Sequence, residues 1–424
     1  MILLKPYLGC NMQCPYCYEQ DIRGPITDEL DATYSIEAMF QTLKPIKNPR
    51  EICLHGGEPL CMPKKDVEEI LQRIYKIHGK SAIQTNALAI DDDYIAIFNK
   101  YKTSVGISFD GPGELSYGRT QHPEVVEANI NKLLDNKIGV AVLVVLNKCN
   151  GIGDNLKKLK EWLIDLDKKG VKSGRINVCS GSKYELTSTE LTKAFLDLAP
   201  FAMANNFQWT PFTDIKNKLR GKGVVCIFEK CDPYHTPSAE VILGDGSITN
   251  CMRLNKTEII LRHPVRTDIR QQILSEIPMD QGGCQGCKWF EQCTGGCPGS
   301  AINNDWRNKT RHCETWYTLF EYFSNVMQFI DYPADGEMTE RPRKNATRKE
   351  AESAAKRGEH GDWADNSLPK IKASSKQEAE ANMRAGKYGD WTNSTPPGVN
   401  GSRQEAEEAA KRGEHGDWTD RSKC

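Results

Sequence analysis

The strongest constraint on the fold is the clustering of cysteines in two places along the chain. The sequence holds 16 cysteines in 424 residues, three of them spaced as Cys10-x3-Cys14-x2-Cys17 and eight more between residues 226 and 313. The opening residues lack the basic and long apolar regions of a secretory signal, so we expect a cytoplasmic protein. In a reducing compartment, clustered thiols predict metal or cluster ligands rather than disulfides.

The charge balance and the lack of long apolar runs argue against two classes of partner. The chain has 56 basic and 57 acidic side chains, for a net charge of -1. This balance provides no general attraction for nucleic acid, which normally requires a basic face. No apolar run reaches the length of a membrane span. We therefore expect neither nucleic acid nor a membrane as a partner.

Residues 2 to about 205 alternate short apolar runs with helical patterns, which is typical of βα units around a parallel sheet. The expected strands are Ile2–Leu8, Glu51–Leu54, Ala82–Gln84, Ser104–Phe109, Gly139–Leu146 and Gly174–Val178. The expected helices lie near residues 29–44, 64–77, 90–100, 122–136, 153–168 and 187–205. Six units are fewer than the eight of a closed barrel, so we predict an α/β fold with a partial (βα)6 TIM-type barrel. Its chemistry should lie at the carboxyl ends of the strands.

Two further regions follow this predicted core at residues 1–205. Residues 206–330 are expected to form a small cysteine-rich domain that needs inorganic ligands for stability. Residues 331–424 contain a linker and three related segments, each with a helix-capping box followed by Gly-Asp-Trp. These GDW repeats span residues 347–367, 375–394 and 402–422. Because such short helices are marginal alone, we expect a flexible helical-repeat tail.

The N-terminal triplet suits a [4Fe-4S] cluster that keeps one iron open. Three thiolates hold three irons and leave the fourth free for a small ligand, whereas a structural zinc ion would take four ligands at another spacing. A second segment, Gly56-Gly57-Glu58-Pro59, ends the second expected strand. Its glycines allow close backbone approach to a ligand, and its carboxylate can pair with an ammonium group.

Together these two segments resemble the radical S-adenosylmethionine (SAM) superfamily, whose members carry CxxxCxxC after the first strand and a GGEP-like segment after the second. Gln84-Thr85-Asn86 and Ser108-Phe109-Asp110-Gly111-Pro112 also resemble family segments, with Ala87 in place of a usual glycine. The resemblance implies that Cys10, Cys14 and Cys17 bind a [4Fe-4S] cluster whose open iron chelates SAM.

The resemblance also implies how the protein would hold SAM. Tyr16 would lie against the adenine. The GGEP segment, Gly56, Gly57, Glu58 and Pro59, would hold the methionine ammonium group. Ser108 and Arg119 would meet the SAM carboxylate. An electron from a donor such as flavodoxin or ferredoxin would cleave SAM to methionine and a 5′-deoxyadenosyl radical, which abstracts hydrogen from an unactivated carbon.

The later cysteines resemble the SPASM extension of radical SAM enzymes, including the run Cys293-Thr-Gly-Gly-Cys297-Pro298. Eight thiolates suffice for two auxiliary [4Fe-4S] clusters. The resemblance implies two interleaved ligand sets: Cys226, Cys231, Cys251 and Cys297 for the first cluster, and Cys284, Cys287, Cys293 and Cys313 for the second. Zinc remains an alternative for these thiols.

SPASM enzymes mostly modify peptides or proteins, so the resemblance implies such a substrate. One branch, the anaerobic sulfatase-maturating enzymes, makes formylglycine with an aspartate base after the third auxiliary cysteine. Here Met252 and Arg253 follow Cys251, so we favour crosslink formation and keep formylglycine formation as the alternative. The cluster loop begins near residue 10, so we expect substrate recognition by the C-terminal parts or a separate protein.

The tail offers candidate substrate sites, because crosslinking relatives join an aromatic ring to a residue two positions later. The matching triplets are Trp363-Ala-Asp365, Trp391-Thr-Asn393 and Trp418-Thr-Asp420. The repeats are either a substrate in cis or docking modules for a partner. A different class of function also stays open, a non-catalytic binding protein stabilised by clusters or zinc.

Overall fold

The computed structural model describes residues 1–19, 34–46, 51–204, 207–233, 238–251, 253 and 269–330. The chain divides into two compact units, Met1–Phe329 and Ile330–Cys424. The GDW repeats lie outside the described residues, as does the first part of the helix expected near 29–44.

A nine-stranded sheet in the order β7-β6-β5-β4-β3-β2-β1-β8-β9 forms the centre of the first unit. Its strands are β1 (Ile2–Lys5), β2 (Ile52–Leu54), β3 (Ser81–Thr85), β4 (Thr103–Ser108), β5 (Val140–Leu146), β6 (Ser173–Val178), β7 (Gln208–Thr210), β8 (Glu240–Leu243) and β9 (Ile248–Thr249). Neighbouring strands are parallel except for the antiparallel pair β8 and β9. The carboxyl ends of β1 to β6 therefore meet at one edge.

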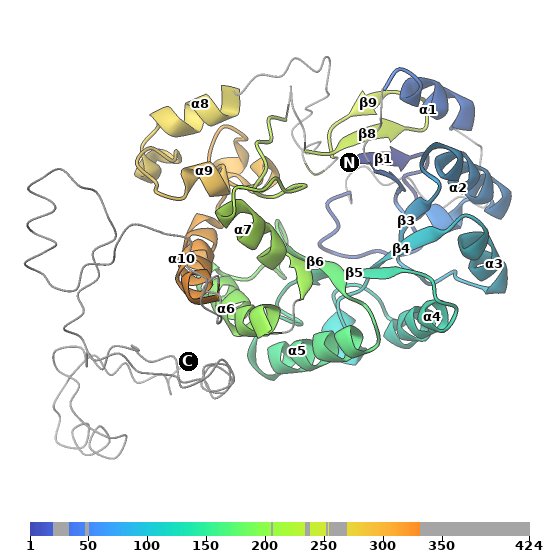
Figure 1. Cartoon of the computed structure of the whole chain (residues 1–424), viewed down its shortest axis with the longest axis horizontal. Helices are drawn as coiled ribbons and strands as arrows, with labels where there is room; N and C mark the ends of the chain where they lie inside the picture. The colour runs from blue at the N-terminus through green and yellow to red at the C-terminus, as the bar shows by residue number, and fades with distance from the viewer. Residues whose placement is uncertain are drawn as a thin grey trace, which may run out of the picture. The chain divides into compact units, whose positions relative to one another are not determined.

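Helices connect these strands and cover the outer side of the curved sheet (Figure 1). They are α1 (Ile36–Leu43), α2 (Lys64–His78), α3 (Asp92–Lys100), α4 (Pro123–Asp135), α5 (Gly153–Lys168), α6 (Ser188–Ala204) and α7 (Phe212–Leu219). After β9 come α8 (Ile269–Glu276), α9 (Phe290–Cys293) and α10 (Cys313–Ile330). Among the described residues, no helix is long and apolar enough to cross a membrane.

Alternating burial explains why these segments form strands beneath helices. Along β5, every second side chain from Val140 to Leu146 is buried. Leu54 and Ile107 are fully buried in the same hydrophobic cluster as Ile70 of α2 and Phe98 of α3. Asp91 caps α3 by accepting a hydrogen bond from the backbone N–H of Tyr94 at 2.9 Å. Local patterning and capping thus favour the βα units that carry the strand ends.

The predicted partial (βα)6 barrel is confirmed, with two differences in detail. The first strand ends at Lys5 rather than Leu8, because the chain then forms a loop against the GGEP segment. Strands β7, β8 and β9 extend the sheet on both sides, and β8 pairs with β1 through Leu4 and Ile242. The domain boundaries stay a prediction.

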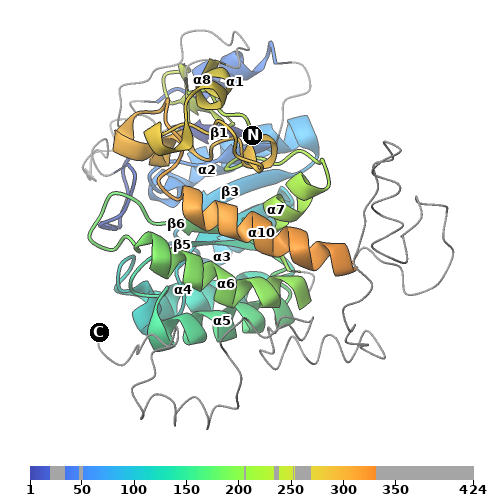
Figure 2. The same ribbon diagram turned by 90° about the vertical axis from the view of Figure 1, so that its left-hand side faces the viewer.

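The cysteine-rich part ends in α10, whose aromatic side chains pack on the barrel. Trp316 of α10 lies 5.4 Å, between ring centres, from both Phe195 of α6 and Phe228. Phe323 packs on Phe212 of α7 at 5.9 Å. Figure 2 shows α10 running across the end of the structure that contains α6 and α7. One hydrophobic cluster therefore continues from the barrel into the end of the cysteine-rich part.

Candidate active site

The loop that carries the cysteine triplet packs directly on the GGEP segment. Because Leu4 pairs with Leu54, the two segments leave adjacent strands side by side. The backbone N–H of Gly57 donates to the carbonyl of Tyr7 at 2.9 Å. A Cβ atom on Gly57 would lie 2.2 Å from the carbonyl oxygens of Leu8 and Gly9. Only glycine permits this approach, which fixes the backbone immediately before Cys10.

Glu58 joins the GGEP segment to the end of β3. Its side chain is buried and accepts hydrogen bonds from Thr85 Oγ1 at 2.6 Å, the backbone N–H of Asn86 at 2.6 Å and that of Leu60 at 2.9 Å. Burial raises the pKa of Glu58 to about 7, although these hydrogen bonds act in the opposite direction. Near neutral pH this carboxyl group can therefore change its charge.

Asn86 continues this connection to the cysteine loop. Its Nδ2 atom donates to Asn11 Oδ1 at 2.6 Å and lies 4.0 Å from Cys10 Sγ. Within the loop, the backbone N–H of Cys17 donates to the carbonyl of Cys14 at 3.0 Å. The ends of β1, β2 and β3 thus surround the triplet with short polar contacts.

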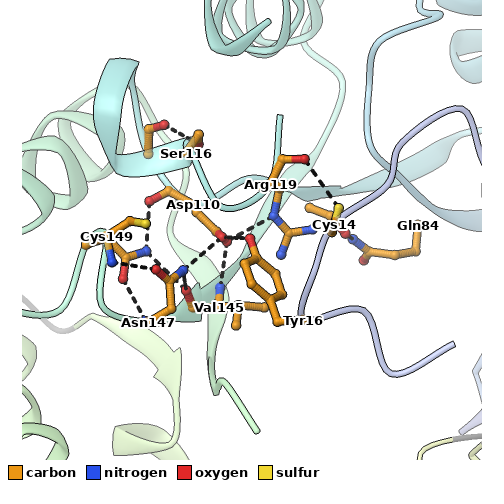
Figure 3. Close-up of polar contacts among 12 residues, drawn as sticks. Cys14, Tyr16, Gln84, Asp110, Ser116, Arg119, Val145, Asn147 and Cys149 are labelled. Atoms are coloured by element: carbon orange, nitrogen blue, oxygen red, sulfur yellow. Dashed lines mark hydrogen bonds and ion pairs between the residues drawn. The ribbon is translucent and has the colours of Figure 1, made fainter. Parts of the chain in front are cut away.

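Asp110 organises the other side of the site (Figure 3). This fully buried carboxylate accepts hydrogen bonds from Tyr16, from Arg119 Nε at 3.0 Å and from the backbone N–H of Val145 at 2.8 Å. Asn147 Nδ2 adds a fourth contact at 3.3 Å. Asp110 therefore ties the cysteine loop to the ends of β4 and β5.

Tyr16 and Arg119 lie against one another beside Cys14. The Arg119 guanidinium is 5.6 Å from the centre of the Tyr16 ring, and its carbonyl oxygen is 3.4 Å from Cys14 Sγ. Burial and the neighbouring charge of Asp110 raise the pKa of Tyr16 well above its ordinary value. The phenol consequently stays protonated and serves as a hydrogen-bond donor to Asp110.

The structure gathers the site residues predicted from the sequence at the carboxyl ends of β1 to β4. They are Cys10, Cys14, Tyr16, Cys17, Gly56, Gly57, Glu58, Pro59, Ser108 and Arg119. Ser108 Oγ accepts a hydrogen bond from Gln84 Nε2 at 2.9 Å. The contacts of Glu58 and Arg119 with neighbouring side chains were not predicted, and the direct roles of these residues in SAM binding remain predictions.

Sequence reasoning missed the organising role of Asp110 and its partner Asn147. Asp110 was noted within a family segment but was given no role of its own. Asn147 directly follows β5, at the edge where the other site residues lie. Its position after a predicted strand was the one available signal.

Four of the later cysteines form a first cysteine set, defined as Cys226, Cys231, Cys251 and Cys297. The pKa of Cys251 is raised by burial and by the thiols of the other three members. Cys251 also lies near Tyr18, which is close to Cys17 of the N-terminal triplet. The first cysteine set therefore lies on the side of the barrel that carries the triplet.

The other four form a second cysteine set, defined as Cys284, Cys287, Cys293 and Cys313. The pKa of Cys293 is raised by burial and by the thiols of the other three members. The eight thiols thus lie in two groups of neighbours, and the binding of one cluster by each group stays a prediction. In the described parts of the chain, no three His, Cys, Asp or Glu side chains converge closely enough to hold a single metal ion.

Arg253 is the second residue after Cys251 of the first cysteine set. Its Nη2 atom donates to Ser180 Oγ at 3.1 Å and to the carbonyl of Val178 at 3.4 Å. Burial lowers the pKa of Arg253. The negative charge that Cys297 and Cys251 carry as thiolates has the opposite effect and is the stronger influence, so the pKa is raised overall. The side chain therefore connects the first cysteine set with the end of β6 as a permanent cation.

Comparisons with known proteins agree with this arrangement. Residues 4–165 match the model of the Radical SAM superfamily. The cysteine-type anaerobic sulfatase-maturating enzyme of Clostridium perfringens strain 13 is 22% identical over 364 residues, which cover 76% of this chain and 95% of that protein.

Two solved structures have a similar fold. The structure of anSMEcpe with bound S-adenosylmethionine and the Kp18Cys peptide has a TM-score of 0.62 at 19% identity, covering 78% of this chain and 98% of that one. The structure of Streptococcus suis SuiB bound to its precursor peptide SuiA has a TM-score of 0.51 at 14% identity. The match covers 74% of this chain and 75% of the SuiB chain. The chain therefore carries a radical SAM domain at residues 4–165 and is a radical SAM enzyme.

Proposed function

We propose that this enzyme oxidatively modifies a side chain of a peptide or protein and forms a crosslink within it. The observation that carries this proposal is the gathering of the cysteine loop, the GGEP segment and the pair Asp110 and Arg119 at one edge of the sheet. The similar proteins with known ligands act on or bind peptides, as their names state: a sulfatase-maturating enzyme, and SuiB with its precursor peptide.

The residues at this edge fit a cluster and SAM. Cys10, Cys14 and Cys17 are partly exposed thiols outside any disulfide, and thiols suit iron as soft ligands. A [4Fe-4S] cluster on these thiols, with SAM, supplies a 5′-deoxyadenosyl radical able to remove hydrogen from an unactivated carbon. Glu58 would hold the amino group of SAM, and Arg119, fixed by Asp110, would orient its carboxylate.

We further propose that the two cysteine sets hold auxiliary [4Fe-4S] clusters. All eight donors are thiols, which is the ligand type of such clusters. A single zinc ion would draw four sulfur atoms to about 2.3 Å from one centre. The N-terminal triplet, whose spacing suits an iron-sulfur cluster, favours iron over zinc for these thiols as well. We place the enzyme in the cytoplasm, where flavodoxin or ferredoxin would reduce it and where thiols stay unpaired.

The residues after Cys251 favour crosslink formation over formylglycine formation, because Met252 stands where the resemblance places the aspartate base and Arg253 follows it. An arginine does not lose its proton in proteins, so it cannot replace an aspartate base. Arg253 reaches the end of β6 next to the first cysteine set. Formylglycine formation is the second candidate, because a curated relative that matches 76% of the chain is named a sulfatase-maturating enzyme.

The GDW repeats provide the substrate to test first. Each contains a tryptophan followed two positions later by Asp or Asn, in a repeated sequence context. The purified chain, reconstituted without oxygen and supplied with SAM and a reductant, should release 5′-deoxyadenosine. Loss of two hydrogen atoms from a peptide containing Trp363, Trp391 or Trp418 would show that the tail is the substrate.

Controls separate the alternatives. Replacing each tryptophan in turn with alanine should abolish the mass change in that repeat alone. Formation of 5′-deoxyadenosine with an unchanged tail would direct the search to a separate peptide. The variant with Cys10, Cys14 and Cys17 replaced by alanine should form no 5′-deoxyadenosine. Iron and sulfide contents of about 12 each per chain would support three clusters, whereas bound zinc without iron would contradict the proposal.

A further inference from the structure

Arg270 is a fully buried cation in the cysteine-rich part of the chain. It is the second residue of α8 and is 0% exposed. Its guanidinium donates to the carbonyls of Trp306 at 2.7 Å, Asn308 at 3.0 Å, Thr294 at 3.4 Å and Gly295 at 3.5 Å. These bonds engage all three nitrogen atoms of the guanidinium, but neutral carbonyls leave its positive charge uncompensated.

The groups that would compensate the charge of Arg270 are cysteines, which carry negative charge as thiolates when they bind a cluster. Its hydrogen bonds all end on backbone carbonyls, and no carboxylate of the described residues pairs with it. Burial lowers the pKa of Arg270, and thiols from both cysteine sets act in the opposite direction: Cys231 and Cys297 from the first, Cys284 and Cys293 from the second. A buried charge needs such compensation to be tolerated.

The backbone around Arg270 physically joins the two cysteine sets. Thr294 and Gly295, whose carbonyls accept from Arg270, lie between Cys293 of the second set and Cys297 of the first. A Cβ atom on Gly295 would lie only 2.4 Å from Leu274 Cδ1 of α8, so glycine permits this close packing. Leu274 also accepts a hydrogen bond from the backbone N–H of Cys284 at 2.6 Å. Helix α8 therefore contacts the backbone next to both sets.

We propose that Arg270 is a shared countercharge that raises the reduction potentials of both auxiliary clusters. This inference rests on the proposed function, because it requires that both cysteine sets hold clusters. A cluster held by four thiolates becomes more negative when it is reduced, and a buried cation stabilises the reduced form. In this role Arg270 is a positioning residue that acts through the clusters rather than on the substrate.

Lys309 provides a matched control, because it lies near one set alone. It is 8% exposed, and its Nζ atom donates to the carbonyl of Met279 at 2.6 Å. Its charge acts on Cys284 and Cys313, both of the second set. Neutralising Lys309 should therefore affect the second cluster alone, whereas neutralising Arg270 should affect both.

The test is a redox titration followed by electron paramagnetic resonance on the full-length chain. Replacing Cys10, Cys14 and Cys17 with alanine leaves the auxiliary clusters as the only signals. In this background, Arg270→Gln should make both clusters harder to reduce. At a fixed potential, the ratio of reduced to oxidised cluster should fall about tenfold. For a one-electron couple this corresponds to a reduction potential lowered by about 59 mV. Arg270→Lys should keep the parental potentials, and Lys309→Gln should shift the second cluster alone.

The outcomes separate this inference from the proposed function. A parent that binds far fewer than about 8 irons would contradict the proposed clusters themselves. Unchanged potentials in a fully loaded Arg270→Gln variant, or a shift in a single cluster, would overturn the shared countercharge. Should Arg270→Gln fail to load iron, Arg270→Lys decides: parental potentials support the role of charge, and lowered potentials refute it.

Discussion

At the scale of single residues, the site depends on two buried carboxylates that bind other protein groups. Asp110 accepts four hydrogen bonds from the cysteine loop, from β5 and from residues that follow β4 and β5. Glu58 accepts three at the ends of β2 and β3. Both groups hold strand ends in place, so their loss should affect stability as well as cofactor binding.

Replacing Asp110 with asparagine should lower the free energy of unfolding by about 3 kcal/mol, because it leaves Arg119 as an uncompensated buried charge. The Arg119 side chain is 9% exposed and Asp110 is 0% exposed. Urea unfolding measures the change. The exposed pair Lys158 and Glu114 is the control, since Glu114→Gln should cost less than about 1 kcal/mol.

A double variant tests the cause. Adding Arg119→Met to Asp110→Asn removes the unpaired charge and should recover part of the lost stability. If Asp110→Asn and Glu114→Gln lowered the free energy of unfolding by the same amount, the buried pair would not be important for stability.

The pKa of Glu58, raised to about 7 by burial, predicts pH-dependent binding of SAM. The carboxylate form attracts the amino group of SAM, and protonation below pH 7 removes that charge. The Kd for SAM should therefore rise as pH falls, approaching about tenfold per unit well below the pKa, and level off above it. Equilibrium dialysis with cluster-loaded enzyme measures this dependence.

The variant Glu58→Gln cannot titrate at this position. Its Kd for SAM should be weaker above pH 7 and independent of pH across this range. A wild-type enzyme whose affinity does not change with pH would refute the contact between Glu58 and SAM.

At the scale of elements, close packing of two loops fixes the position of the cysteine triplet. Replacing Gly57 with alanine places a methyl group 2.2 Å from two backbone carbonyl oxygens, which cannot move aside as a side chain would. We expect a loss of about 1–3 kcal/mol in the free energy of unfolding and reduced iron binding by the triplet. Urea unfolding and iron analysis measure the two effects.

Gly139→Ala is the matched control in the same sheet. Its added Cβ would meet Ser104 Oγ at an ordinary 3.8 Å, at an exposed position before β5. We expect a change within about 0.5 kcal/mol and normal iron binding. Similar losses in the two variants would show that the close approach of the loops is unimportant.

The sequence predicts elements and site residues to the extent that the signal is local. The alternation along β5 spans seven residues and identifies that strand. Strand β7 has three residues, too few for a pattern, and β9 has two. Cysteine spacing likewise marks the triplet, since its ligands are neighbours along the chain.

The network around Asp110 could not be predicted in this way. Tyr16 is 94 positions from Asp110 in the sequence, and Asn147 is 37 positions away. These partners meet because parallel strands bring their carboxyl ends to one edge, which becomes evident only once the order of the strands is known. Tertiary contacts of this kind decide which polar residues near a motif organise the site.

At the scale of the whole molecule, the first unit combines barrel and cysteine-rich part through a shared core. Trp316 and Phe320 of α10 belong to the same hydrophobic cluster as Leu4 and Ile107 of the barrel. Arg253 connects the first cysteine set with β6 through Val178. Apolar packing and polar contacts within the first unit thus hold the cysteine sets against the strand ends.

Removing residues 331–424 should therefore leave the stability of the first unit unchanged. This segment contains one leucine, one isoleucine, one valine and no phenylalanine, too few apolar side chains for a core of its own. We expect a Tm within about 2 °C of the full-length value by calorimetry, and unimpaired formation of 5′-deoxyadenosine. Trp316→Ala is the positive control for the assay. Loss of this buried ring should lower the free energy of unfolding by about 3–5 kcal/mol. A large fall in Tm on truncation would contradict this prediction and mean that the tail stabilises the first unit.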